Sequence, residues 1–382
     1  MNNLQSEVSQ QYRDLFGTAP QWVVRAPGRV NLIGEHTDYN DGFVLPMAID
    51  RATWIAVGPA EGRTVQVHLM DFGRTEEFSL DDIAPAKASP IEYIKGVAAM
   101  LLADDYSLNG WQGVLKGDIP IGAGLSSSAA MEMAVARAFG AVSGFEWDAP
   151  KMALLGQRVE NTWLKLKTGI MDQMISAAGQ AGHALLIDCR TLELTPAPMP
   201  DGVVAVVMDT GTRRGLVHSA YNERREQCEA AAHHFGVKAL RDVSVDEFAA
   251  RADELDELTR KRARHVVTEN ARTLAAYEAM TAGDARILGA LMDASHESLR
   301  DDFEVSTDAL NTMVTIAQRH PGCLGARMTG AGFGGCAVAL VKAEAADDFT
   351  SWVSPQYEAA TEHKPSLYIC TASQGASMEV VP

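Results

Sequence analysis

PIGAGLSSSAAMEMAVARAFG, residues 120–140, joins a strand to a helix through a glycine-rich turn. The apolar residues 114–115 predict the strand, Gly122 and Gly124 permit a tight turn, and the alanine- and methionine-rich letters predict the helix. Three serines, residues 126–128, stand where that helix begins. A helix start has about four unpaired backbone N–H groups and roughly half a positive charge, so it suits an anion. One serine suffices to cap a helix, so three of them favour a phosphate-binding loop.

Three common nucleotide-binding motifs do not account for this turn. A Walker A loop requires Gly-Lys, a dipeptide that occurs nowhere in the chain. The dinucleotide pattern GxGxxG fails because Ser127 stands where its last glycine would be. The letters DFG occur at residues 71–73 without the HRD and VAIK motifs of protein kinases. A second glycine-rich stretch, MTGAGFGGCAVALV at 328–341, is weak evidence alone, because glycines before a strand often mark only a bulge.

The composition describes an acidic chain with a substantial core. It has 382 residues, 47% of them hydrophobic, and 33 Lys and Arg against 50 Asp and Glu, a net charge of −17. This length suggests about two or three domains. The charge repels phosphate backbones, and the basic run at 260–265 follows acidic residues as on a solvated helix, so no nucleic-acid partner is expected. No apolar run approaches the roughly 18 residues of a membrane helix, so no membrane partner is expected either.

The cysteines and the N-terminal segment indicate a reducing compartment. Five cysteines are scattered without a CxxC pair: Cys189, Cys228, Cys323, Cys336 and Cys370. An odd, dispersed set favours free thiols over a disulfide framework or a zinc site. Residues 4–16 have helical spacing but lack the basic start and apolar core of a signal peptide. We therefore expect a cytoplasmic protein, as a monomer or a weak homodimer.

The order of expected elements predicts an α+β fold with two lobes. The first half mixes strands with helices, and the second half opens with a buried strand in VVAVVMDTG, residues 203–211, and continues with long helices. The expected strands are 22–24, 53–57, 64–69, 112–118, 183–187, 337–341 and the segment SLYICTA. The expected helices are 91–104, 125–142, 150–164, 218–236, 246–256, 262–281, 284–298 and 306–319. The proline-rich letters at 194–202 favour a boundary there, giving domains 1–198 and 199–382.

Charged and hydrogen-bonding side chains gather in RAPGRVNLIGEHTDYNDGF, residues 25–43, directly after the strand expected at 22–24. The block from Gly28 to Tyr39 resembles the galactokinase signature at every position that the signature specifies. The resemblance implies a hexose ligand, and fixed carboxylates and donors suit its hydroxyls, because an epimer would leave buried partners unpaired.

Three further blocks follow in the order of that family. PIGAGLSSSAA is similar to the nucleotide-phosphate loop of the GHMP kinase superfamily, GIMDQ at 169–173 to the galactokinase segment with the catalytic aspartate, and MTGAGFGGCAVAL to the third superfamily motif. The resemblance implies a two-lobed GHMP kinase fold, with a ribosomal protein S5 domain 2-like N-terminal lobe, a ferredoxin-like C-terminal lobe and the active site between them. It also implies transfer of the γ-phosphate of ATP to the anomeric hydroxyl of D-galactose, giving α-D-galactose 1-phosphate and ADP.

The resemblance assigns a role to each matching residue. The catalytic residues would be Asp172 and Arg29, and the sugar would be held by Glu35, His36, Asp38, Gly169 and Tyr221. ATP would be held by Gly122, Gly124, Leu125, Ser126, Ser127, Ser128 and Ala129. Mg²⁺ would be held by Ser128 and Glu160. The role of Asp172 stays open between a general base and a charge that positions the reacting groups.

Several positions depart from the family pattern. Lys165 and Lys167 replace a short turn with a glycine before GIMDQ, and either assist phosphate transfer or, as we expect of lysines, point to solvent. Pro90 stands where the family often has an aromatic residue, so the sequence does not decide whether ATP or GTP is the preferred nucleotide. Two other functions compete: a GHMP kinase for another sugar, such as N-acetylgalactosamine or arabinose, and a sensor that binds sugar and ATP without turnover. The intact phosphate loop and Asp172 disfavour the sensor.

Overall fold

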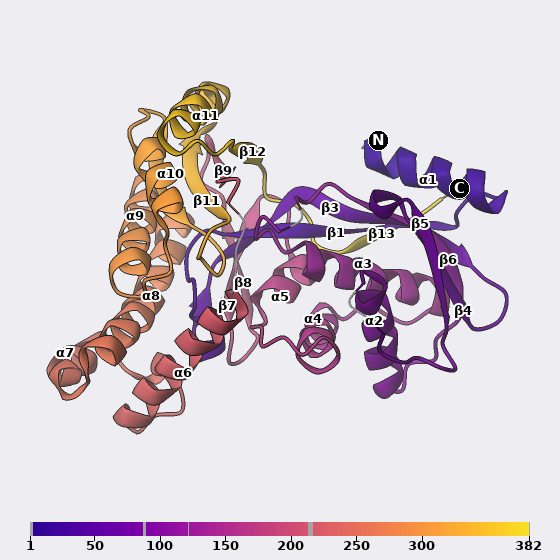
Figure 1. Ribbon diagram of the computed structural model, residues 1–382, viewed down its shortest axis with the longest axis horizontal. Coiled ribbons are helices and arrows are strands. Elements are labelled where there is room, and N and C mark those ends of the chain that lie inside the picture. Colours follow the sequence, from indigo (N-terminus) through magenta and orange to yellow (C-terminus); the bar gives the residue numbers. More distant parts are fainter. Residues whose placement is uncertain (1–2, 87–88, 121, 213–216, 382) are drawn as a thin grey trace.

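Two lobes of mixed helix and strand confirm the expected α+β fold (Figure 1). This computed structural model describes residues 3–86, 89–120, 122–212 and 217–381. The first lobe contains a six-stranded sheet in the order β13-β1-β3-β6-β4-β5, and the second a four-stranded sheet in the order β10-β11-β9-β12. A three-stranded sheet, β2-β7-β8, completes the strands of the described residues.

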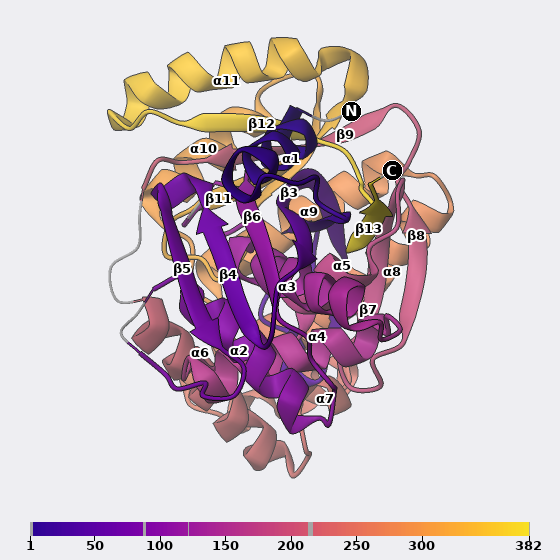
Figure 2. The same ribbon diagram turned by 90° about the vertical axis from the view of Figure 1, so that its right-hand side faces the viewer.

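The six-stranded sheet carries helices on both faces (Figure 2). Its strands are β1 (Trp22–Asn31), β3 (Pro46–Pro59), β4 (Thr64–Leu69), β5 (Arg74–Ser79), β6 (Trp111–Gly117) and β13 (Ser377–Val380). All paired neighbours are antiparallel except β4 and β6. Helix α1 (Asn3–Phe16) contacts β3 and β6 on one face, and α3 (Ser127–Ser143) contacts β1 and β3 on the other. The other helices beneath the sheet are α2 (Ile91–Ala103), α4 (Ala149–Arg158) and α5 (Met171–Ala178).

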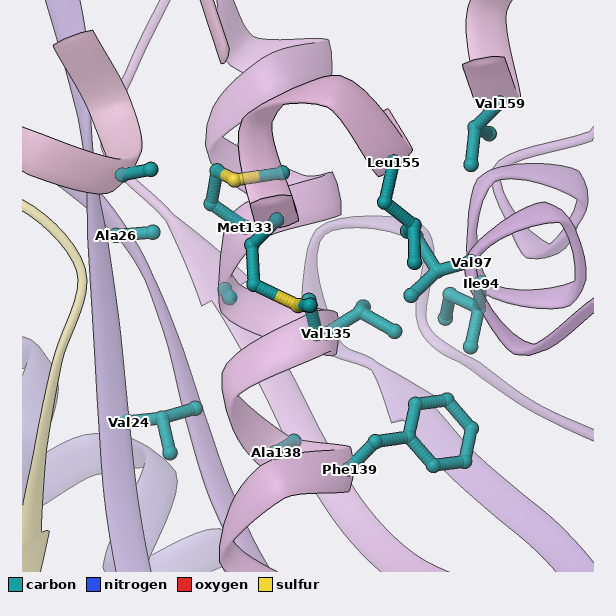
Figure 3. Close-up of a cluster of buried hydrophobic side chains, with 14 of the residues drawn as sticks. Val24, Ala26, Ile94, Val97, Met133, Val135, Ala138, Phe139, Leu155 and Val159 are labelled. Atoms are coloured by element: carbon teal, nitrogen blue, oxygen red, sulfur yellow. The ribbon is translucent and has the colours of Figure 1, made fainter. Parts of the chain in front are cut away.

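Helix α3 has apolar residues on nearly every side, and most of these residues are buried, as expected of a helix in the core. Figure 3 shows its Met133, Val135 and Phe139 among side chains of the sheet and of helices α2 and α4. Phe139 also lies edge-on to Trp111 of β6, with ring centroids 5.7 Å apart. This packing fixes where α3 begins, and its first turn faces the space between the lobes.

The second lobe packs helices against its antiparallel sheet. The strands are β9 (Val203–Asp209), β10 (Cys323–Met328), β11 (Cys336–Lys342) and β12 (Ser366–Cys370). The helices are α6 (Val217–Phe235), α7 (Val245–Arg251), α8 (Glu257–Thr281), α9 (Ala285–Asp301), α10 (Asp308–Gln318) and α11 (Ala346–Thr361). Most expected elements are therefore confirmed, with ends shifted by a few residues.

The proline-rich segment at 194–202 contains a strand that we did not expect. Residues Leu194–Pro198 form β8, which pairs with β7 (His183–Asp188), and β7 pairs in turn with β2 (Phe43–Val44). Proline is tolerated in β8 because it is the edge strand of its sheet. Strand β13, near the end of the chain, returns to the first lobe and pairs with β1. The domain limits 1–198 and 199–382 remain predictions. Within the described part of the chain, no helix is long and apolar enough to cross a membrane.

Candidate active site

A cavity of about 1020 Å³ lies between the lobes and gathers most of the residues singled out in the sequence. Its lining includes Arg29, Glu35, His36, Asp38, Gly122, Gly124, Ser126, Ser127, Ser128, Glu160, Gly169, Asp172 and Tyr221. Leu125 and Ala129 are fully buried in the core and do not line it. The cavity lining also includes Tyr93, Lys165, Lys167 and Asn222, for which the sequence analysis predicted no firm role.

Asp172 is the centre of the hydrogen bonding in this cavity. Arg29 binds its carboxylate with two parallel contacts, Nε to Oδ1 at 2.8 Å and Nη2 to Oδ2 at 2.7 Å. The Ser126 hydroxyl donates to Oδ2 as well. Arg29 is buried and also donates through Nη1 to the Gly124 carbonyl oxygen at 2.6 Å. This two-point geometry fixes the plane of the carboxylate and ties it to the glycine turn.

The glycine turn leaves the start of α3 free to bind an anion. Gly122, Gly124 and Ser126 have φ angles of 74°, 85° and 59°, so the chain turns sharply just before the helix. Ser126 is the N-cap, but its side chain caps no helical N–H and is used for Asp172 instead. Gly28 of β1 lets the turn approach closely, because a Cβ there would lie 2.7 Å from the Leu125 carbonyl oxygen. The local geometry therefore favours a phosphate over a simple serine cap.

A π-helical turn, Val159–Trp163, follows α4 and places Glu160 in the cavity. Such turns frequently occur at functional sites because the extra residue re-aims the side chains. Glu160 Oε1 accepts a hydrogen bond of 3.1 Å from the Ser128 hydroxyl. Burial raises the pKa of Glu160, and the charge of Asp172 raises it further, whereas a hydrogen bond from Thr168 lowers it.

The oxygens of Ser128 and Glu160 fit a hard divalent cation. Such a cation takes oxygen ligands and keeps several positions for water and substrate phosphates. Two protein oxygens beside the start of α3 match that requirement. Among the described residues, no group of three or more His, Cys, Asp and Glu side chains could hold a metal by itself.

Behind this pair lies a second buried carboxyl that the sequence did not reveal. Glu132 of α3 is fully buried, and its Oε2 accepts from Gln173 Nε2 at 3.2 Å, while Oε1 has no partner among the described residues. Burial raises its pKa well above the usual value, and the neighbouring Glu160 adds to the shift. Gly156 of α4 makes room for the pair, because a Cβ there would lie 2.9 Å from Gln173 Cγ. The sequence analysis missed Glu132 because a single glutamate among alanines and methionines does not by itself indicate burial.

Glu35 is held by the third glycine-rich stretch. Its Oε1 accepts from Gly330 N at 2.7 Å, Thr329 Oγ1 at 3.0 Å and Arg327 Nη1 at 3.4 Å. Arg327 and Thr329 are completely buried, and Glu35 nearly so. Oε2 makes no hydrogen bond within the described ranges. The end of β10 thus orients one carboxylate oxygen and leaves the other for a ligand.

His36 adopts a left-handed conformation with φ of 63°, which turns its ring into a pocket of aromatic side chains. Its Nδ1 lies 2.8 Å from the Tyr39 hydroxyl, and its ring centroid lies 5.6 Å from that of Tyr221 and 4.7 Å from that of Phe303. Nε2 is buried without a partner in the described part of the chain. Burial lowers the pKa of His36 well below its usual value, so the ring is neutral and has one polar atom left for a ligand.

Asp38 lies against Gly169, and the two positions depend on each other. A Cβ at Gly169 would overlap the Asp38 carboxylate, so only glycine fits there. Asp38 accepts from Tyr39 N at 3.0 Å. Burial raises the pKa of Asp38 to about 7, and the charge of nearby Asp172 contributes to the rise. Gly169 thus makes room for the Asp38 side chain in the cavity.

A buried polar network supports the signature loop from the second lobe. Glu269 of α8 accepts from Gly34 N at 3.0 Å, from Ser295 Oγ at 2.6 Å and from Arg272 Nε at 2.8 Å. Burial raises the pKa of Glu269, but the charge of Arg272, together with further nearby charges and the hydrogen bond from Ser295, outweighs burial and lowers the pKa to about 2. His265 Nε2 lies 3.1 Å from the Glu35 carbonyl oxygen. The residues of the second lobe in this network belong to no motif, so the sequence reasoning missed them.

The fold and this cavity define a class of small-molecule kinase. The GHMP kinases N-terminal domain matches residues 92–180, and the GHMP kinases C-terminal domain matches residues 276–354. The galactokinase galactose-binding signature matches residues 10–59. The chain is 46% identical over 374 residues to the galactokinase of Roseiflexus sp. (strain RS-1), which covers 97% of this chain and 96% of that relative. The chain belongs to the galactokinase family.

Solved structures agree with this family. The chain is similar to the crystal structure of Lactococcus lactis galactokinase complexed with galactose, with a TM-score of 0.93 and 36% identity over 98% of this chain and 100% of the other. Methanococcus jannaschii mevalonate kinase has the same fold, with a TM-score of 0.65 and 20% identity over 92% of this chain and 98% of the other. The expected GHMP kinase fold and the resemblance to galactokinases are confirmed.

Proposed function

We propose that this chain transfers the γ-phosphate of ATP to the anomeric hydroxyl of D-galactose, giving α-D-galactose 1-phosphate and ADP. One observation carries the proposal. Asp172 is held rigidly by Arg29 and Ser126 between two unlike ends of one cavity. One end presents the carboxylates of Glu35 and Asp38, and the other presents the start of α3.

The sugar end binds the hydroxyls of galactose. Glu35 and His36 hold the 6-hydroxyl end, Asp38 accepts from the 3- and 4-hydroxyls, and Tyr221 of α6 packs against the sugar. The unpartnered Nε2 of His36 supports this role, because a buried polar atom needs a partner, and the three donors to Oε1 of Glu35 leave its Oε2 for a sugar hydroxyl. An epimer whose hydroxyls failed to reach these atoms would leave them without a hydrogen bond and would bind more weakly, so the site selects the orientation of the hydroxyls. Gly169 contributes by making room for Asp38.

The phosphates lie on the turn formed by Gly122, Gly124, Leu125, Ser126, Ser127, Ser128 and Ala129. Backbone N–H groups at the start of α3 donate to them, so buried Leu125 and Ala129 contribute only through the main chain. Ser128 and Glu160 hold a divalent cation, proposed to be Mg²⁺. When bound, that cation neutralises charge on the phosphates.

The reaction is a single displacement at phosphorus. The bond from the anomeric oxygen to the γ-phosphorus forms as the bond from that phosphorus to the ADP oxygen breaks, and ADP leaves with the electron pair. Asp172 takes the proton of the anomeric hydroxyl and aligns its oxygen. Arg29 faces the transferring phosphoryl group and stabilises its charge. The two-point contact from Arg29 holds the Asp172 carboxylate in one orientation, which supports a large contribution of Asp172 to positioning the anomeric hydroxyl.

A panel of free sugars tests this proposal. Purified protein with ATP and Mg²⁺ is given galactose, N-acetylgalactosamine, arabinose or glucose, and ADP release is measured. We expect galactose to be the best acceptor and its product to carry phosphate on the anomeric oxygen. Glucose or N-acetylgalactosamine as the best acceptor would contradict the proposed substrate. Absence of turnover with every sugar, together with measurable binding of ATP and galactose, would favour the sensor.

We further propose that the enzyme acts in the cytoplasm as a monomer or a weak homodimer. The cysteines support a reducing compartment, because none of the five forms a disulfide within the described residues, and Cys228, Cys336 and Cys370 are buried. Sedimentation of the purified protein over a range of concentrations tests the oligomeric state.

A further inference from the structure

Two lysines line the active-site cavity without an acidic partner. Lys165 and Lys167 both belong to the lining, and both are exposed, as expected from the sequence. Within the described ranges, neither makes an ion pair with a carboxylate, whereas five other lysines do: Lys95, Lys116, Lys151, Lys238 and Lys261. Two cations that face a ligand cavity and have no protein counter-charge are available to an anionic ligand.

The loop that carries these lysines is held in place. Leu166 N donates to the Glu160 carbonyl oxygen at 2.8 Å, which ties the loop to the π-helical turn. At its other end, Thr168 N donates to Asn161 Oδ1 at 2.9 Å. Lys165 has a φ of 61°, a conformation that non-glycine residues rarely adopt and that the surrounding contacts maintain. The loop therefore presents both lysines from a defined backbone close to Glu160.

The charges of the cavity explain why such cations are needed. Its lining contains the carboxylates of Glu35, Asp38, Glu160 and Asp172. Among the described residues of that lining, Arg29 is the only arginine, and its guanidinium binds Asp172 and the Gly124 carbonyl. A nucleotide triphosphate brings several further negative charges into this space. Helix-start N–H groups, Arg29 and one divalent cation offset part of that repulsion, and Lys165 and Lys167 are the other cationic side chains that the described lining contains.

We propose that Lys165 and Lys167 bind the terminal phosphates of the nucleotide and set its affinity. The identity of the nucleotide rests on the proposed function, but the cation pair itself would serve any polyphosphate that enters this cavity. Because both lysine side chains are exposed, the effect of each charge is moderate and depends on salt. Affinity gained in this way increases with the number of phosphates on the ligand.

Direct binding of ATP, ADP and adenosine, measured by calorimetry at low and high salt, tests the proposal. The test variant is Lys165→Asn with Lys167→Gln, since asparagine tolerates the left-handed backbone at 165. We expect the Kd of ATP to rise about tenfold at low salt and that of ADP to rise less. The Kd of adenosine and that of galactose should stay within about twofold, and the salt dependence of ATP binding should weaken.

A matched control removes the same charge elsewhere. Lys116→Gln with Lys151→Gln changes two lysines that are paired with Glu7 and Asp148 and do not line the cavity. It should leave ATP binding unchanged. An unchanged ATP Kd in the test variant, or an equal loss for adenosine, would overturn the inference. Galactose phosphorylation by the unmodified protein is assayed separately, so a failure of the proposed function is recognised even where the lysine effect is found.

Discussion

The two ends of the cavity are built by different means. At the sugar end, buried side chains are fixed by other buried side chains, as Glu35 is by Arg327, Thr329 and the backbone of Gly330. At the nucleotide end, a glycine turn, a helix start and two exposed lysines form the surface. Rigid side chains discriminate between sugars by the orientation of their hydroxyls. Backbone N–H groups and exposed lysines bind phosphate whatever group the phosphate is attached to.

Asp172 lies where the two ends meet, and its removal should have the largest effect. Asp172→Asn keeps the size of the side chain but loses the charge that Arg29 and Ser126 hold in place. We expect kcat to fall about 10²–10⁴-fold, the range of a positioned proton acceptor. The Kd of galactose and of ATP should change far less. Steady-state kinetics and calorimetry measure the two quantities.

The exposed carboxylate of Asp253, paired with Arg260, provides the control for this substitution. Asp253→Asn should leave kcat unchanged. A kcat for Asp172→Asn within about tenfold of the unmodified enzyme would exclude Asp172 as the proton acceptor and leave it a positioning role only.

Removing one of the donors that orient Glu35 should weaken galactose binding and leave ATP binding unchanged. Arg327→Met replaces a fully buried side chain with an apolar one of similar length and removes the guanidinium. Nε and Nη2 of that guanidinium have no partner among the described residues. Glu35 then keeps two of its three donors. Hydrogen bonds to charged groups are worth about 1.5–3 kcal/mol, so the Kd of galactose should rise about 10- to 100-fold.

The same variant should bind ATP within about twofold of the unmodified enzyme, because Arg327 lies beneath the sugar end. Calorimetry with each ligand alone separates the two effects. The surface variant Arg300→Met, which loses only an exposed pair with Asp301, should behave as unmodified protein in both titrations. Equal losses for galactose and ATP would mean that Arg327 supports the whole fold instead of one end.

The sequence predicted the parts of the site that lie in contiguous blocks. Arg29, Glu35, His36 and Asp38 share one short segment, and its resemblance to the galactokinase signature predicted that they line one cavity, which they do. The phosphate turn was predicted for the same reason, since a glycine turn before a helix has a local geometry.

The sequence could not predict partners that tertiary packing brings together. Arg327 meets Glu35 only because β10 of the second lobe ends beside the signature loop, and Glu269 meets Gly34 from a helix without any motif. Glu132 stands among alanines and methionines, where its burial follows from the packing of α3. The strand Leu194–Pro198 was missed because prolines indicate turns unless the strand is known to be an edge.

Asp38 should make galactose binding depend on pH. Its pKa of about 7 in the free enzyme means that half of the molecules carry a neutral carboxyl at that pH. If the carboxylate is the form that accepts the sugar hydroxyls, the Kd of galactose should be about tenfold higher at pH 6 than at pH 8, because only the ionised fraction binds. Calorimetry in matched buffers measures this ratio. Asp38→Asn should bind weakly at both pH values, and a flat profile for the unmodified enzyme would contradict the assignment.

The same carboxyl should also affect stability. A pKa raised from 3.8 to about 7 means that the native state holds a proton that the unfolded chain releases. The free energy of unfolding of the ligand-free enzyme should therefore fall as pH rises from about 4 to 7, and stay low above it. Asp38→Asn should remove this slope and be the more stable protein at pH 8. Denaturant unfolding at several pH values checks the sign.

Glu132 offers the smallest and most discriminating change, at the nucleotide end. Its carboxyl is buried, one oxygen lacks a partner, and its raised pKa means that ionisation is costly in the native state. Glu132→Gln keeps an acceptor for Gln173 and removes the ionisable group. The variant should therefore be more stable at pH 8, by about 1–3 kcal/mol, and equal to the unmodified enzyme near pH 4, where the carboxyl is protonated in both states.

Catalysis should respond much less than stability in this variant. If the nucleotide end is shaped by its backbone turn, a neutral side chain beneath it suffices, and kcat and the KM for ATP should stay within about twofold. Glu132→Ala serves as the contrast, because it opens a cavity and leaves Gln173 without its acceptor. A large loss of kcat in Glu132→Gln would mean that the nucleotide end, like the sugar end, depends on a buried charge, and the difference between the two ends would disappear.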